Sequence, residues 1–347
     1  MSQPIPSAEY AAVRDGGAGL FDLSSRGRIQ VSGGEVVMFL NGLITNDMKT
    51  LAVNSWMPAA FPNVQGRLLA GVRVIHRDDG FLIDTERETR ETVLKLLERF
   101  TMAGDFQVAD VTGGTDLLSL QGKNAADVLR AVLGHEAADV GRQQVVTAKT
   151  GNGNRVNVIR ATHSAEDGFD LFIDGNAAVD LRDLLTGAGA RAVGPEVLES
   201  LRIEAGIARY GIDMDDTNVV SETNLDDAVS FTKGCYVGQE IIARIKYRGH
   251  VAKKLSGIIV PGEPTLETGA KILSADGKEI GRVTSSTFSP RLKRTIALGY
   301  VKYDFLTPGT QVKVMSSEKE LSAVVAELPF IRGSWYQKSE PPAAAGG

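Results

Sequence analysis

The feature that most constrains the fold is an internal repeat in the first half of the chain. Residues 29–33, Ile-Gln-Val-Ser-Gly, predict a strand and turn before a helix that begins at Val36. Residues 118–122, Leu-Ser-Leu-Gln-Gly, predict the same turn before a helix over 125–133. The final glycines of the two segments lie 89 positions apart. A fixed offset between similar segments indicates a duplicated structural unit.

The second halves of the two units repeat at nearly the same offset. Gly80 opens a strand before a helix predicted over 87–100, and Gly168 opens a strand before a helix predicted over 177–185. Each unit is therefore predicted to run strand, helix, two strands, helix, strand, which is the split order of ferredoxin-like folds. Chance similarity between common strand-glycine-helix turns is the alternative. The paired strands are predicted over 67–75 with 81–85, and over 155–162 with 169–174.

The last third of the chain alternates short apolar runs with Gly and Pro turns, which is typical of a β-barrel or sandwich. We predict an α+β protein in which a duplicated ferredoxin-like body precedes a C-terminal β-barrel. The predicted domains are residues 1–115, residues 116–250 with the cysteine loop, a barrel over 251–338 and a disordered tail over 339–347, with the first two units free to interleave. The barrel strands are predicted over 255–260, 279–286, 296–300, 311–314 and 321–328.

Composition excludes several classes of protein. The 347 residues are 43% hydrophobic, enough for several cores, and the net charge of −5 argues against nucleic acid as the main ligand. The single cysteine, Cys235, excludes an internal disulfide and a thiolate metal site, and the four histidines have no metal-binding spacing. With no secretory signal and no long apolar run, we expect no membrane partner and a reducing compartment, the cytoplasm or, in a eukaryote, the mitochondrial matrix.

Residues 233–240, Lys-Gly-Cys-Tyr-Val-Gly-Gln-Glu, form the densest unusual segment. Glycines permit positive φ and close approach of the backbone to a ligand. A thiol two residues after Lys233 and near a basic strand is a candidate reactive group, whereas free cysteine is commonly buried and inert. Alternation over 243–248 predicts a strand whose one face carries three cations, which either hold a polyanion such as a polyglutamate tail or face solvent. These cations are Arg244, Lys246 and Arg248.

Glu204 falls on the apolar stripe of a helix predicted over 195–209. A buried carboxylate needs a partner. The partner is either an arginine such as Arg202 or Arg209, or the two parallel N–H donors of a pterin-like or guanine-like edge. The acidic run at 213–227 lacks the spacing of a calcium loop, so we predict a solvated loop there.

Together these segments resemble the folate-binding T-protein (aminomethyltransferase) of glycine cleavage and its YgfZ-like relatives. Residues 39–47, Phe-Leu-Asn-Gly-Leu-Ile-Thr-Asn-Asp, resemble the shared F-L-x-G-x-x-T-N-D segment. Residues 201–211 resemble L-R-x-E-A-G followed by Y-G, and residues 289–301 resemble the start of the family's C-terminal domain. Residues 233–240 match the K-G-C-Y-x-G-Q-E signature of the YgfZ branch. The resemblance runs from about residue 20 to residue 336.

The resemblance implies three domains in a ring around a central channel that holds tetrahydrofolate or another reduced folate. It implies that the Glu204 carboxylate contacts the pterin, and that Cys235 and Lys233 carry the chemistry. The other residues that it places near the folate are Asn46, Asp47, Tyr236 and Trp335.

One departure from the family pattern decides the expected function. T-proteins carry an aspartate in a G-x-x-L-D-D strand that helps to direct the reactive folate nitrogen, but here Ala70 and Gly71 replace the acids. Neither residue can accept a proton or orient an amine. We therefore expect a tetrahydrofolate-binding factor that supports assembly or repair of iron–sulfur clusters, with client or assembly proteins as partners. The alternatives are a tetrahydrofolate-dependent aminomethyl- or methyltransferase acting on a small amine, and a non-catalytic folate sensor.

Overall fold

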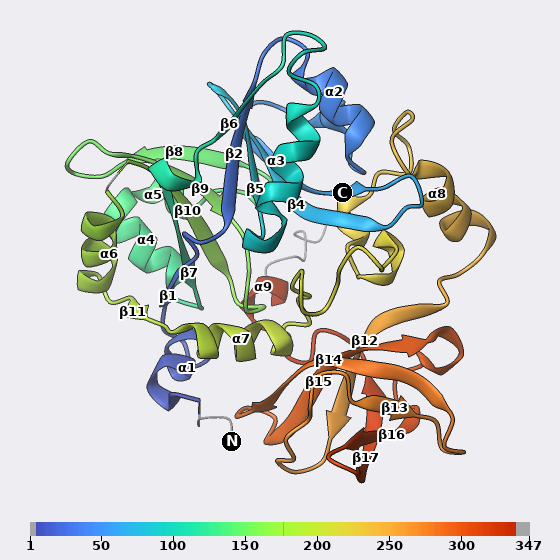
Figure 1. The fold of residues 1–347 in the computed structure, drawn as a ribbon. Helices are drawn as coiled ribbons and strands as arrows, with labels where there is room; N and C mark the ends of the chain where they lie inside the picture. Colours follow the sequence, from blue (N-terminus) through green and yellow to red (C-terminus); the bar gives the residue numbers. More distant parts are fainter. Residues whose placement is uncertain (1–4, 176, 338–347) are drawn as a thin grey trace, which may run out of the picture.

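The computed structural model describes residues 5–175 and 177–337 and shows an α+β protein built of three parts (Figure 1). A five-stranded sheet packs against a six-stranded sheet, and a closed barrel lies below both in the view of Figure 1. Between the sheets, Ile75 and Leu82 of the first contact Leu117 and Phe172 of the second. The predicted fold class, an α+β body with a C-terminal β-barrel, is confirmed.

The first repeat forms the five-stranded sheet. Its elements are β2 (Gly27–Ser32), α2 (Val36–Leu43), β3 (Ser55–Pro62), β4 (Leu68–Arg77), β5 (Gly80–Thr85), α3 (Arg90–Glu98) and β6 (Gln107–Asp110). The strand order is β3-β4-β5-β2-β6. Alternate residues of β4, such as Val72 and Val74, pack against Val93 and Leu97 of α3, so the helices cover one face of the sheet. The other face of β4 is turned away from the helices.

The second repeat has the same order of strands and helices with one additional short helix, α5, which confirms the duplication. They are β7 (Thr115–Gln121), α4 (Ala125–Leu133), α5 (His135–Ala138), β8 (Val145–Lys149), β9 (Arg155–Arg160), β10 (Gly168–Asp174), α6 (Ala178–Gly187) and β11 (Arg191–Ala192). Each unit has three strands between its helices, so the prediction of two was wrong. The missed strands, β3 and β8, are edge strands, and Pro58 and Pro62 in β3 are tolerated because an edge strand leaves part of its ladder unpaired.

The N-terminal strand β1 (Gly19–Asp22) breaks the symmetry between the units. It lies between β7 and β11 and takes the place beside β7 that β6 takes beside β2. The turn glycines of the two units show the same difference: Gly33 packs against the segment before β6, and Gly122 packs against the segment before β1. A Cβ on Gly33 (φ +120°) would lie 2.2 Å from the Asp105 carbonyl oxygen, and one on Gly122 (φ +130°) would lie 2.5 Å from that of Gly17. Both turns therefore require glycine, and β1 completes the second sheet, whose order is β11-β1-β7-β10-β9-β8.

Two predictions for the segment between the sheets and the barrel were wrong. Helix α7 (Pro195–Glu204) ends five residues before Arg209, because Gly206 adopts a φ of +69°. Residues 243–248 belong to a helix, α8 (Gln239–Arg248), with Ile242 buried. The short alternation there could not distinguish a strand from a helix. In a helix the three cations do not share one face.

The C-terminal part is a closed barrel and not a sandwich. Its strands are β12 (Lys253–Val260), β13 (Lys271–Leu273), β14 (Glu279–Ser289), β15 (Arg294–Lys302), β16 (Gln311–Ser316) and β17 (Lys319–Ala326). Strand β12 pairs with both β15 and β17, which closes the barrel. The prediction missed β13, which has only three residues. In the described part of the chain, no helix is long and apolar enough to cross a membrane. The predicted tail over 339–347 lies outside the described residues.

Two short terminal helices complete the described chain. Helix α1 (Ser7–Arg14) lies beside α7, and α9 (Ser334–Gln337) lies near the middle of the molecule in Figure 1. Both contribute residues to the networks described below.

Candidate functional site

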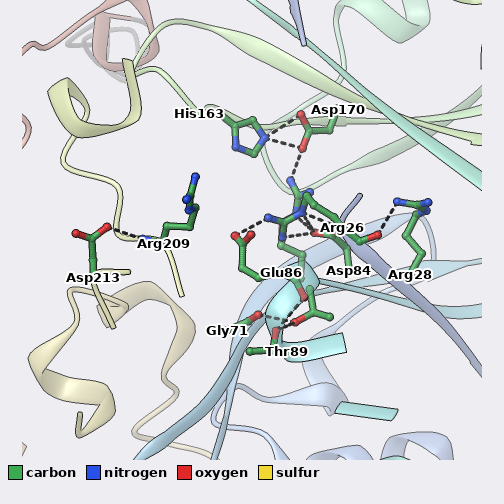
Figure 2. A network of polar contacts seen from close by, with 12 residues as sticks. Arg26, Arg28, Gly71, Asp84, Glu86, Thr89, His163, Asp170, Arg209 and Asp213 are labelled. Atoms are coloured by element: carbon green, nitrogen blue, oxygen red, sulfur yellow. Dashed lines mark hydrogen bonds and ion pairs between the residues drawn. The ribbon is translucent and has the colours of Figure 1, made fainter. Parts of the chain in front are cut away.

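A cluster of charged side chains lies where the two sheets face each other, and we call it the inter-sheet cluster (Figure 2). Arg73 of β4 bridges the sheets: its Nε donates to Asp84 of β5 at 2.7 Å and its Nη1 donates to Asp170 of β10 at 2.5 Å. The Nη2 of Arg73 is buried and has no hydrogen-bond partner among the described residues. The members of the inter-sheet cluster are Arg26, Arg73, Asp84, Glu86, His163 and Asp170.

Both aspartates of the inter-sheet cluster are fully buried yet ionised. Burial acts to raise the pKa of Asp84, but Arg26 and Arg73 outweigh it and hold that pKa below its usual value. For Asp170, burial is likewise outweighed by His163 and Arg73, so its pKa is also low. The aspartates therefore act as fixed negative charges and not as proton donors near neutral pH.

His163 is the imidazole of the cluster and is partly exposed to solvent. Its Nε2 lies 2.9 Å from Asp170 Oδ2, and one-fifth of its side chain is exposed. Pairing with an ionised carboxylate assigns the proton to Nε2 and leaves Nδ1 as an acceptor. This arrangement can hold or accept a proton at Nδ1.

The β4 face that carries Arg73 also carries Gly71. Alternation places Gly71 and Arg73 on one face, while Ala70 lies in the core with α2 and α3. Of the two positions where the family's acids are replaced, only residue 71 is on the face of the inter-sheet cluster. A Cβ built on Gly71 would meet only Leu225 Cδ1, at 3.7 Å, an ordinary contact, so a side chain fits at this position without a clash.

Lys233 holds the cysteine loop to the end of α2. Its Nζ donates to the carbonyl oxygens of Asn41 (2.8 Å), Ile44 (2.9 Å) and Asn46 (2.6 Å). Burial lowers the pKa of Lys233 to about 8, with Asp47 partly opposing that shift. The ammonium group thus anchors the backbone where helix α2 leaves its last carbonyls unpaired.

The other residues predicted around this loop also hold backbone. Asn46 Nδ2 donates to the carbonyls of Pro58 (2.8 Å) and Asp227 (3.3 Å), and Asp47 Oδ1 accepts from the Lys49 amide at 3.0 Å. Tyr236 lies in a small apolar core beneath the Lys233 ammonium, and burial raises the pKa of its hydroxyl to about 12. The structure therefore brings Asn46, Asp47, Lys233 and Tyr236 together. The role of Asn46, Asp47 and Tyr236 in binding folate and the chemical role of Lys233 stay predictions.

Cys235 is exposed, which contradicts the alternative of a buried, inert cysteine. The two flanking glycines differ. Gly238 has a φ of +79°, and a Cβ there would lie 2.4 Å from the Asn63 carbonyl oxygen, whereas a Cβ on Gly234 would meet nothing within 4 Å. Gly238 is thus required because the start of helix α8 lies close to the turn at Asn63. The loop exposes the thiol of Cys235 to solvent.

Glu204 lies in a second network, away from Arg202 and Arg209, its predicted arginine partners. Its Oε1 accepts from Tyr10 (2.7 Å) and Ser289 (2.5 Å), and its Oε2 accepts twice from Arg14, at 3.0 Å and 2.7 Å. Its side chain has no exposed surface. Four donors satisfy a carboxylate's acceptor positions. The predicted contact between Glu204 and a pterin stays a prediction, and it requires at least one of these donors to leave.

Trp335 is linked to the same network. Its amide donates to the Ala165 carbonyl at 3.2 Å, and the Arg142 guanidinium lies 4.2 Å from the centre of its ring. The preceding residue, Ser334, donates to Glu166, which is paired with Arg14 at 3.0 Å. Glu204 and Trp335 are thus joined through Arg14 and Glu166, while the other predicted site residues surround the Cys235 loop.

The acidic run contains a buried structural carboxylate, so the prediction of a wholly solvated loop was wrong. Asp213 is 1% exposed and accepts from Arg202, Thr284 and Ser285. Arg202 therefore pairs with Asp213, and also with Glu199, rather than with Glu204. Within the described residues, no group of three His, Cys, Asp or Glu side chains could hold a metal ion.

Sequence reasoning missed the inter-sheet cluster. One signal was present: Asp170 stands inside the apolar run Phe169 to Ile173, and a buried aspartate is almost always paired. The partner could not be identified, because Arg73 lies 97 positions away along the chain.

The fold and the networks define a three-part α/β and barrel protein, and comparison with known proteins identifies its class. Sequence profiles of the GCVT N-terminal domain and of the glycine cleavage T-protein C-terminal barrel domain match residues 2–233 and 253–331. The chain belongs to the glycine cleavage T-protein family. Members of this family use tetrahydrofolate, so the predicted cofactor is confirmed at the level of the family.

Individual relatives match over nearly the whole chain. An aminomethyltransferase of Rubrobacter xylanophilus is 32% identical over 343 residues, which cover 98% of this chain and 89% of the relative. The mitochondrial aminomethyltransferase of Mus musculus is 28% identical over 91% of this chain and 80% of its own. The crystal structure of the glycine cleavage system aminomethyltransferase T from Bartonella henselae superposes with a TM-score of 0.83 at 25% identity, covering 94% of this chain and 89% of the other.

Proposed function

We propose that this chain binds tetrahydrofolate and transfers to it the one-carbon unit of an aminomethyl or methyl donor, whose remaining group leaves as the carbon bonds to a folate nitrogen. The observation that carries this proposal is the similarity to aminomethyltransferases along the whole chain, 32% over 98% of its residues, together with the shared fold. This ranks the transferase, which the sequence alone placed second, above the iron–sulfur factor.

The inter-sheet cluster offers features that fit a folate heterocycle. A Cβ at Gly71 would make only an ordinary contact with Leu225, so the backbone of β4 is open to close approach there, and the Nη2 of Arg73, which has no partner among the described residues, would donate to a ring carbonyl. The bound folate would supply the nitrogen that accepts the one-carbon unit. Since residue 71 has no carboxylate, His163 Nδ1 is the proton acceptor that we assign to this face, with Asp170 holding the imidazole in position.

A reconstituted assay tests this proposal. The purified chain is incubated with tetrahydrofolate and a lipoylated carrier protein loaded with the aminomethyl group, and methylene-tetrahydrofolate and ammonia are measured. We expect turnover that falls on the order of a hundredfold in His163→Gln and is unchanged in Cys235→Ala. Absence of turnover in a chain that binds tetrahydrofolate by calorimetry would overturn the transferase proposal.

A second candidate is the YgfZ-like function, a tetrahydrofolate-dependent factor that supports iron–sulfur proteins in the cytoplasm or, in a eukaryote, the mitochondrial matrix. One observation favours it: Lys233, Tyr236 and Gly238 fix a loop that exposes the thiol of Cys235. A deletion strain complemented with wild type or Cys235→Ala and scored for iron–sulfur enzyme activities tests it. Loss of complementation in Cys235→Ala supports this candidate, and full complementation removes Cys235 from it.

Labelling distinguishes where the thiol lies relative to the folate. Iodoacetamide labelling of Cys235 is followed with and without tetrahydrofolate. Protection by the folate would place the thiol beside the ligand and would join the two candidate functions in one site. Equal labelling would mean that Cys235 acts away from the folate.

A further inference from the structure

A cleft separate from the inter-sheet cluster opens between residues 212–218 and the barrel. Its volume is about 660 Å³, within the range of small-molecule sites. No member of the inter-sheet cluster lines it. The lining residues that matter here are Met214, Asp215, Lys253, Val283 and Tyr300.

Tyr300 gives this cleft an unsatisfied polar group. The residue is 8% exposed, and its hydroxyl has no hydrogen-bond partner among the described residues. Nearly all buried polar groups in proteins are paired, and an unpaired one is costly. Burial, followed by the nearby carboxylates of Glu222, Asp213 and Asp215, raises the pKa of the Tyr300 hydroxyl. The hydroxyl therefore keeps its proton and is available as a donor.

The charges around the cleft are distributed unevenly. The loop side carries Asp213 and Asp215, and the barrel side carries Lys253, Arg282 and Lys302 together with one acid, Glu279, which is paired with Arg282 at 3.2 Å. Asp213 is already paired with Arg202, whereas the Asp215 carboxylate accepts, among the described residues, only from Thr217 of its own turn. Lys253 places its ammonium 4.8 Å from the centre of the Tyr300 ring. The Asp215 carboxylate and the Lys253 ammonium can thus contact a ligand from opposite sides of the cleft.

We propose that this cleft binds a small zwitterion of the α-amino-acid class. The ligand carboxylate meets Lys253 and accepts from the Tyr300 hydroxyl, and the ligand ammonium meets Asp215. Met214 and Val283 supply the apolar surface for its side chain. This site is additional to the one-carbon transfer proposed above, because it uses none of the inter-sheet cluster.

Titration of the unmodified full-length chain tests the class of ligand. The twenty common amino acids are screened by thermal shift, and the best is titrated by ligand-observed NMR beside its N-acetyl and carboxamide derivatives. We expect saturable binding by the free amino acid and at least tenfold weaker binding by each blocked derivative, since each loses one charged contact. No saturable binding, or equal binding by the blocked forms, would overturn the proposal.

Two variants locate the site. Tyr300→Phe keeps the ring and removes a hydroxyl that has no partner, so the fold should be retained, and Lys253→Gln removes the cation. We expect each to weaken amino-acid binding about tenfold while tetrahydrofolate binding is unchanged. The matched control is Tyr303→Phe, at an exposed tyrosine that stacks on His250 outside the cleft. Wild-type affinity in Tyr300→Phe would place the ligand elsewhere.

Discussion

The charged residues with the least exposure hold the parts of this molecule together. Arg14 has no exposed side-chain surface and contacts Glu204 of α7, Glu166 and the Ser164 carbonyl. Glu204 in turn accepts from Ser289 of the barrel. One buried pair therefore connects α1, the second sheet, α7 and the barrel. Removing one member of such a pair leaves an uncompensated buried charge, which costs more than the pair contributes.

We expect Glu204→Gln to lower the free energy of unfolding by about 3–5 kcal/mol, because Arg14 then lies buried beside a neutral amide. Urea denaturation measures it. The control is Glu199→Gln, whose carboxylate pairs with Arg202 and Arg209 but is 31% exposed and should matter less. If Glu204→Gln unfolds like the wild type, the carboxylate is not structural and its predicted contact with the pterin gains support.

We expect Gly71→Asp to raise aminomethyl transfer at least tenfold, since positioned acids and bases contribute on the order of a hundredfold or more. The new side chain would lie on the face of the inter-sheet cluster, where its Cβ has ordinary contact with Leu225. The reconstituted assay measures it, with Gly113→Asp as a control for added charge at a position with no neighbour within 4 Å. Equal rates in wild type and Gly71→Asp would show that a carboxylate at position 71 is not what limits transfer.

At the scale of elements, the features that a local sequence pattern encodes could be predicted from the sequence. Gly33 and Gly122 revealed the duplication because both turns need the same positive φ. The edge strands β3 and β8 were missed, since prolines and polar residues that an edge tolerates argue against a strand in general. The segment over 243–248 was assigned to a strand because six residues carry too little periodicity.

The candidate site was predicted only in part, for a different reason. The resemblance located Lys233, Cys235 and Glu204, but their partners are distant in sequence. Lys233 meets Asn46 at a separation of 187 positions, and Glu204 meets Arg14 at 190. Pairing over such distances depends on the assembled sheets, so no local pattern could have named the partners.

The two glycines of the cysteine loop give a prediction at this scale. Gly238→Ala introduces a Cβ against the Asn63 carbonyl in a backbone conformation that alanine rarely adopts, so we expect a loss of about 1–3 kcal/mol. Gly234→Ala adds a Cβ in open space and should change stability by less than about 0.5 kcal/mol. Thermal unfolding compares them. Equal losses would mean that the tight approach at Gly238 does not hold the loop.

At the scale of the whole molecule, the two sheets are joined by apolar packing and by the inter-sheet cluster. Arg73 reaches an acid on each sheet, Asp84 on its own and Asp170 on the other. The charges are buried, so salt screens them less than it screens surface pairs. Their contribution to stability should depend on pH more than on ionic strength.

We expect the free energy of unfolding to fall as the pH drops below about 4, where unfolded carboxyl groups take up protons. Because the pKa values of Asp84 and Asp170 are depressed in the folded protein, their stabilising contribution is present above the unfolded pKa and is lost as the pH falls toward the folded values. Urea denaturation at pH 7, 5, 4 and 3 measures this. Asp170→Asn should lower the free energy of unfolding at pH 7 and make it depend less steeply on pH. The control is Asp180→Asn, at an exposed aspartate, which should change neither quantity. If the free energy of unfolding of Asp170→Asn falls with pH as steeply as that of the wild type, the loss of stability in acid comes from protonation of carboxylates other than Asp170.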